Sequence, residues 1–182
     1  WYYVGRCAKI GQAADVWGEH GPQLLTPGER YHDADANVDT LGAVMEVAAG
    51  EPAERMIERR LFQALGMIDS TTLLNKGEAR LSRVAGKNAG GRGRWRQFWS
   101  WQGKPYFSFP MFAQGFYSTP LDYARFMQMV MDGGTASGKQ ILSKDAIGRM
   151  LTPVSQTTMP TGFAGLNASY GQLMQLYEKS GK

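Results

Sequence analysis

A short stretch of the chain gathers side chains of the kinds that reactive pockets use. Five polar residues stand within seven positions, directly before a segment with helical periodicity: Tyr31, His32, Asp33, Asp35 and Asn37. Carboxylates at such a place also favour the positive partial charge of a helix N-terminus and can cap the helix, and we expect that role for Asp35. For Tyr31 the simpler interpretation is an aromatic side chain that packs in front of the helix. The sequence therefore raises a reactive pocket as a hypothesis beside two structural alternatives.

Two consecutive helices must position this polar stretch. The first is predicted from about Ala36 to Ala49, because apolar residues recur every three or four positions, and Gly50 follows where a left-handed C-cap is needed. Its apolar stripe consists of Val38, Leu41, Val44, Met45 and Ala48. The second helix begins at Pro52 and closes at Gly66. Its predicted buried face consists of Met56, Ile57, Leu61 and Leu65. Together the two helices form an αα-hairpin.

A third helix is predicted within residues 115–134. Thr119 can cap it, Pro120 follows at the first helical position, and Asp122 completes a T-x-x-D capping box. The Gly133-Gly134 pair ends the helix. Its predicted buried stripe is Leu121, Ala124, Met127, Val130 and Met131.

The rest of the C-terminal part is predicted from its turn residues. Residues 138–142 form a short extended return, Ser143 caps a last helix, and Pro153 stops that helix. The side chains expected inside are Ile147, Met150 and Leu151. Within residues 169–182 apolar and polar side chains alternate for a few residues and stop at a turn, which predicts a strand whose hairpin partner is missing.

A basic and aromatic region separates the two helical parts. Five cations stand among residues 83–96, in a glycine-rich run: Arg83, Lys87, Arg92, Arg94 and Arg96. The glycine spacing matches no P-loop, so we expect a solvated loop. Aromatic residues follow from Trp95 to Phe109 and indicate a hairpin or two extended arms. They suit a core edge or a substrate wall, and a nucleic-acid partner is not expected.

Composition narrows the class of protein further. The 182 residues are 43% hydrophobic and 20% charged, with a net charge of +4, which is ordinary for one globular domain. No apolar run is long enough to span a membrane. Cys7 is the sole cysteine, and His20 and His32 are the only histidines, so we expect no metal and no disulfide framework. The chain opens on Trp-Tyr-Tyr-Val without an initiator Met, which predicts an internal segment of a longer protein.

Several of these segments carry a family resemblance in their order. They are PGERYH, ANVDTLGAVMEVAAGEP, RLFQALGMIDSTT, GFYSTPLDYARFMQMVMDGG and KQILS. Over residues 27–151 the chain resembles the serine β-lactamase-related family, which groups class C β-lactamases, DD-carboxypeptidases and β-lactamase-like esterases. The resemblance implies an α/β fold of the α+β type, the β-lactamase/transpeptidase-like fold. Residues 1–182 are expected to be an incomplete domain of it, holding mostly the helical region and one or two strands of the antiparallel sheet.

The resemblance also implies which motifs carry the chemistry. Such enzymes use a nucleophile in S-x-x-K, a tyrosine in Y-x-N and a K/H-x-G strand beside the oxyanion hole. No Ser or Thr of this chain is followed by Lys at the third position, and the family order places S-x-x-K before residue 1 and K/H-x-G after residue 182. Counting back from Leu41-Gly42 puts Y-x-N on Asp33-Ala34-Asp35. Asp35 retains an acceptor, but a carboxylate at position 33 is a far weaker base than a tyrosinate. Tyr31, two positions upstream, is the candidate to take its place.

From this resemblance we expect a serine hydrolase that acts on an ester or amide through an acyl-enzyme when full length, with residues Tyr31, Asp33 and Asp35 near the reaction. The segment alone is expected to be inactive and to expose apolar surface. The partner is expected to be a small ester, amide or peptide substrate, and no metal or organic cofactor is implied. Family members are often exported to the periplasm or secreted. The alternative is a non-catalytic relative that keeps the fold for binding, which Asp33 favours.

Overall fold

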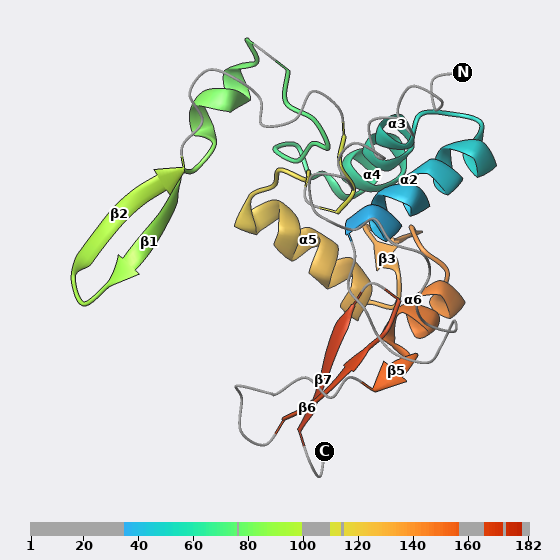
Figure 1. The fold of residues 1–182 in the computed structure, drawn as a ribbon. Coiled ribbons are helices and arrows are strands. Elements are labelled where there is room, and N and C mark those ends of the chain that lie inside the picture. Colours follow the sequence, from blue (N-terminus) through green and yellow to red (C-terminus); the bar gives the residue numbers. More distant parts are fainter. Residues whose placement is uncertain are drawn as a thin grey trace, which may run out of the picture.

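The computed structural model describes residues 35–75, 77–99, 110–113, 115–156, 166–172 and 174–179. Helices and short antiparallel strands alternate along these residues, as the α+β prediction requires. Figure 1 shows the helices gathered around α5 and one β-hairpin standing apart from them. No helix in the described ranges is long and apolar enough to cross a membrane.

The predicted αα-hairpin is confirmed. Helix α2 spans Asp35–Ala49, and Gly50 ends it with a φ of +66°. The second arm runs through α3 (Ala53–Ile57), a π-helical turn (Glu58–Phe62) and α4 (Gln63–Leu65) without a break. Gly66 closes this arm in the left-handed conformation that glycine adopts without steric cost.

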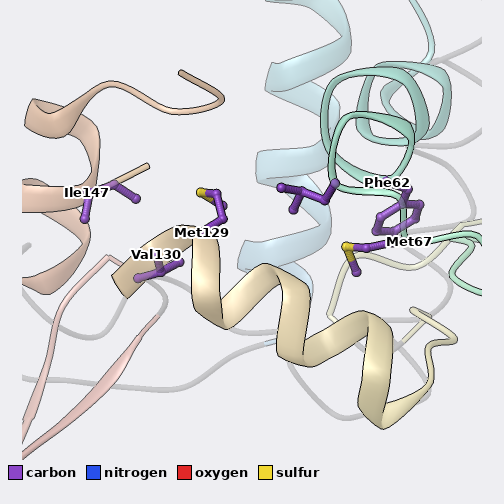
Figure 2. Packing of buried hydrophobic residues seen from close by; sticks show 6 residues of the cluster. Phe62, Met67, Met129, Val130 and Ile147 are labelled. Carbon is purple, nitrogen blue, oxygen red and sulfur yellow. The ribbon is translucent and has the colours of Figure 1, made fainter. Parts of the chain in front are cut away.

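The core lies where α4 meets the C-terminal end of α5. Helix α5 spans Pro120–Met131 and α6 spans Lys144–Leu151, each started by a hydroxyl cap from Thr119 and Ser143 as predicted. In Figure 2, Met129 and Val130 lie between Phe62 and Met67 on one side and Ile147 on the other. These side chains and Leu65 form a single buried apolar cluster.

The burial predicted for α5 was partly wrong. Val130 is buried, but Leu121 and Met131 are 65% and 77% exposed, and Ala124 is exposed as well. The helix joins the core cluster mainly through its C-terminal end, which leaves Leu121 near its N-terminus exposed. Its fully buried positions are Met129 and Asp122 instead.

On helix α2, too, the buried face differs from the predicted apolar stripe. Leu41 and Val44 of the predicted apolar stripe are exposed. Among residues 38–49, the buried positions are Asp39, Gly42 and Glu46, which recur at three and four residues on one face. On α6, Ile147 is buried as predicted, whereas Leu151 is exposed.

The strands form two hairpins and one three-stranded sheet. Strands β1 (Lys87–Gly91) and β2 (Arg94–Trp99) pair antiparallel, so the glycine-rich run expected as a loop is a strand. Strands β3 (Thr135–Ala136) and β4 (Lys139–Gln140) form the predicted short return. The sheet has the order β5 (Ser155–Gln156), β6 (Leu166–Tyr170), β7 (Gln175–Lys179). Strand β7 therefore has a hairpin partner, β6, which the sequence prediction lacked.

Candidate active-site region

The sequence-predicted site residues stand at the start of α2. Tyr31 and Asp33 lie outside the described residues. Asp35 is the first residue of α2, and its side chain is likewise not described. The role of Tyr31, the place of Asp33 and the capping role of Asp35 therefore stay predictions.

The turns of α2 that follow this motif are tied to a segment more than seventy residues away. The Asp39 carboxylate accepts hydrogen bonds from the backbone N–H of Phe112 at 2.7 Å and of Ala113 at 3.2 Å. Gly42 lies under the Phe112 ring, because a Cβ at this position would stand 2.1 Å from the ring carbon Cδ2. Segment 110–113 is thereby held against the N-terminal half of α2. The sequence did carry one signal for this contact, since a glycine inside a helix indicates a close approach.

A pocket of about 370 Å³ lies between residues 116–120 and residues 69–85. Its walls come from two stretches of chain that an antiparallel bridge between Thr71 and Tyr117 joins, with N···O distances of 3.0 and 2.9 Å. The apolar lining consists of Leu74, Val84, Ala85, Phe116 and Pro120, and the polar lining includes Asp69, Arg80, Arg83, Ser118 and Thr119. The described residues that line the pocket come from positions 69–85 and 116–120, and none of them belongs to α2.

A buried carboxylate holds residues that line this pocket. Asp122, 1% exposed, accepts hydrogen bonds from the Asp69 backbone N–H at 2.8 Å and from the Ser70 hydroxyl at 2.9 Å. Its other oxygen accepts from the Arg125 guanidinium at 2.5 Å. The predicted capping box is therefore half present: the Thr119 hydroxyl accepts from the Asp122 N–H, whereas the carboxylate turns inward.

This network also engages the serine that lines the pocket. The hydroxyl oxygens of Ser118 and Ser70 lie 2.8 Å apart. Because Ser70 gives its single hydroxyl hydrogen to Asp122, the hydrogen between the two serines comes from Ser118. A carboxylate acting through another hydroxyl is a poor base for activating a serine, since activation needs the base within direct hydrogen-bond reach. The arrangement suits a structural role for Ser118.

The pocket rim carries an ion pair. The Arg83 guanidinium lies 2.6 Å from the Asp69 carboxylate. This hydrogen bond holds the pKa of Asp69 below its ordinary value of 3.8, and the same bond raises the pKa of Arg83. Arg80 is engaged too, by the Ser70 carbonyl at 3.4 Å and by Glu78 at 3.4 Å. The described residues hold no group of three or more His, Cys, Asp or Glu side chains that could bind a metal ion.

Comparisons with known proteins identify several that resemble this chain in sequence or in structure. Protein Rv1367c of Mycobacterium tuberculosis is 28% identical over 149 residues, which is 79% of this chain and 36% of that protein. A mutant of the simvastatin synthase LovD from Aspergillus terreus matches with a TM-score of 0.69 and 18% identity, over 91% of this chain and 45% of that one. The D-amino acid amidase of Ochrobactrum anthropi, complexed with L-phenylalanine amide, matches with a TM-score of 0.65 and 21% identity, over 94% and 46%.

Each of these matches covers only part of the other protein, and the matching solved structures share one fold. The chain spans about a third of the length of the curated relative and under half of each of these solved structures. The likeness to the solved structures shows the β-lactamase/transpeptidase-like fold. The model of the family described as Beta-lactamase matches residues 12–182, nearly the whole sequence. The chain therefore belongs to the β-lactamase family.

Proposed function

We propose that this chain forms part of a serine hydrolase that cleaves an ester or amide through an acyl-enzyme, with the nucleophile supplied from outside these 182 residues. The observation that carries the proposal is the family match over residues 12–182. The absence of any S-x-x-K in the sequence supports a nucleophile from elsewhere. An amidase and a synthase among the structural neighbours are compatible with acyl chemistry on this fold.

In this proposal the start of α2 faces the reacting proton. The residues that occupy the Y-x-N place are Asp33-Ala34-Asp35. Asp39, one turn further along α2, ties the helix to segment 110–113 and gives that end of the helix a fixed neighbour. Tyr31 is the residue that would stand in for the missing tyrosine as proton acceptor.

The substrate class follows from charge. Two carboxylates in the Y-x-N place would repel the carboxylate that β-lactams and D-Ala-D-Ala peptides carry. A small ester or an amide without a carboxylate beside the scissile bond is therefore the favoured substrate.

A specific observation favours a second function. Asp33 replaces the tyrosine on which the family's proton transfer depends, and a carboxylate with an ordinary pKa near 4 is a poor substitute. A non-catalytic relative that retains the fold for ligand binding would show this change.

A serine-reactive probe on the longer protein separates the two functions. Fluorophosphonate labelling of a serine in S-x-x-K, with turnover of a p-nitrophenyl ester, is expected for the hydrolase. The Tyr31→Phe variant should then lose acylation, whereas a His32→Phe variant, matched in position, should keep it. No labelling of an intact, folded longer protein would refute the hydrolase and favour the binding function.

The 182-residue chain provides its own control. It should form no covalent adduct, because its pocket serine, Ser118, is held in the network of Asp122 without a base of its own. An adduct on Ser118 would overturn this assignment.

A further inference from the structure

The β1–β2 hairpin has no part in the proposed hydrolase site. Its strands pair with each other as a separate two-stranded sheet, and Figure 1 shows it standing clear of the helices. Every residue of β1 is exposed, and Trp95 on β2 is 68% exposed. A lone two-stranded hairpin gains little stability in water, so a surface that covers it would stabilise it.

The hairpin is strongly cationic. The sequence contains no Asp or Glu between Glu78 and Asp122, although seven Lys or Arg residues stand there. Three of these, Arg92, Arg94 and Arg96, take part in none of the ion pairs among the described residues.

Cross-strand pairing leaves these guanidinium groups uncovered. Arg94 pairs with Gly91 and Arg96 with Ala89, and paired residues share a face of the ribbon. Glycine and alanine have no side chain long enough to reach the charged groups. The third cation, Arg92, occupies the turn with a φ of +52°, followed by Gly93 at +77°. The chain thus keeps an arginine at a left-handed tip position where Asn, Asp or Gly are favoured.

The opposite face of the tip carries an aromatic ring. Trp95 pairs with Gly90, whose φ is +150° and where a Cβ would stand 2.0 Å from the Arg94 carbonyl oxygen. Only glycine fits beside the strand there, so no side chain opposes the tryptophan. The tip therefore presents one large exposed ring on one face, Arg94 and Arg96 on the other face, and Arg92 in the turn.

We propose that this tip, residues 90–96, docks on an anionic phospholipid surface. Tryptophan is favoured at the membrane–water interface, because one end of the ring is apolar and the other donates a hydrogen bond. Arginine side chains reach phosphate groups while their stems lie along apolar surface. An anionic leaflet supplies the charge that the hairpin lacks.

The arrangement favours a lipid surface over a nucleic acid. A platform that stacks bases presents several aromatic rings in sequence along a cationic groove. Here the described tip has one ring, on the face of the ribbon opposite Arg94 and Arg96. Each of the three arginines lies within three residues of Trp95, at most about 10 Å along the strand. This is close to the Debye length of about 8 Å at physiological ionic strength, so a leaflet that contacts the ring attracts all three.

The expected strength of vesicle binding follows from the three arginines and from the tryptophan ring. Each basic residue near an anionic leaflet strengthens binding about fivefold, so the three arginines together contribute about a hundredfold. Removal of the ring's apolar surface should weaken binding about tenfold more.

The test measures co-flotation of the full 182-residue chain with phosphatidylcholine vesicles that contain or lack phosphatidylglycerol. Arg92→Gln/Arg94→Gln/Arg96→Gln is compared with a control that removes the same charge elsewhere: Arg55→Gln/Lys139→Gln/Lys144→Gln. These control side chains are exposed and stand in no ion pair among the described residues. Trp95→Ser is compared with Ile68→Ser, whose side chain is 80% exposed. Circular dichroism checks that each variant keeps its helices.

We expect binding to the anionic vesicles only, with loss at 1 M salt, a hundredfold loss in the hairpin triple variant and a tenfold loss in Trp95→Ser, and much smaller losses in both controls. Equal losses in the two triple variants would overturn the proposal. So would the absence of vesicle binding, as expected if another part of the protein covers the hairpin. Tighter, equally Arg-dependent binding of a single-stranded oligonucleotide would assign the tip to nucleic acid instead and refute the lipid surface.

Discussion

Replacing Asp122 by alanine removes the acceptor that joins α5 to the exit of the αα-hairpin. In the intact protein its carboxylate receives the Asp69 backbone N–H and the Ser70 hydroxyl, which belong to the exit of the αα-hairpin. It also receives Arg125 from the next turn of its own helix. Alanine would leave these donors without an acceptor at a site that is almost fully buried.

The loss in free energy of unfolding that we expect for Asp122→Ala follows from these contacts. A hydrogen bond to a charged group contributes about 1.5 kcal/mol at the low end of its range, and two such bonds to buried donors are lost. Arg125 is 40% exposed and recovers water, so its pair adds about 0.5 kcal/mol. The free energy of unfolding should therefore fall by about 3–4 kcal/mol in Asp122→Ala. Asp122→Asn can keep one oxygen toward Asp69 and Ser70 and should lose about 1–2 kcal/mol.

Urea unfolding followed by circular dichroism measures both changes, and thermal melting should show the alanine variant about 10 °C lower. The control is Asp132→Ala, an exposed carboxylate at the other end of α5 that accepts from Gln128, where we expect under about 0.5 kcal/mol. Hydrogen exchange at the Asp69 amide gives a local readout. Equal losses in Asp122→Ala and Asp132→Ala, with unchanged exchange at Asp69, would refute the reasoning.

Two further predictions concern packing and pH. Gly42→Ala should destabilise the fold by about 1–3 kcal/mol in urea unfolding, because the new Cβ would overlap the Phe112 ring. Gly148→Ala on α6, with nothing within 4 Å, should instead stabilise it by about 0.5–1 kcal/mol, and a gain at both positions would contradict the close approach. The Asp69–Arg83 pair lowers the pKa of Asp69 in the folded state, so its contribution to stability is complete above about pH 5 and is lost as pH falls through that lowered pKa. NMR titration should find the pKa of Asp69 below 3.8, and Arg83→Gln should raise it; no change in that variant would show that other groups lower it.

Local chemistry predicted the helix boundaries well. The left-handed glycines at 50 and 66 and the hydroxyl caps Thr119 and Ser143 are set by residues within one turn of each helix end. Such short-range causes can be read from a single sequence, and the order of these segments was enough to indicate the family.

The buried faces were harder to predict, because distant partners decide them. Asp122 is buried because its carboxylate accepts hydrogen bonds from donors 52 and 53 residues away in the sequence. The pattern of apolar residues along α5 contains no information about those donors. The strand at 87–91 was missed for a related reason. Its residues have weak strand propensity, and the pairing with β2 across the Arg92-Gly93 turn determines its conformation.

Two helices of this chain use a buried carboxylate in the same manner. Asp39 on α2 accepts the backbone N–H groups of Phe112 and Ala113. Asp122 on α5 accepts the backbone N–H of Asp69 and the hydroxyl of Ser70. Tyr117, which precedes α5 in the sequence, pairs with Thr71 next to the residues that Asp122 holds. Apolar contacts tolerate sliding, whereas an N–H and an acceptor bond only within a narrow range of distance and angle. The two carboxylates thus restrict how α2 and α5 stand against the rest of the described residues, through hydrogen bonds that no motif search would include.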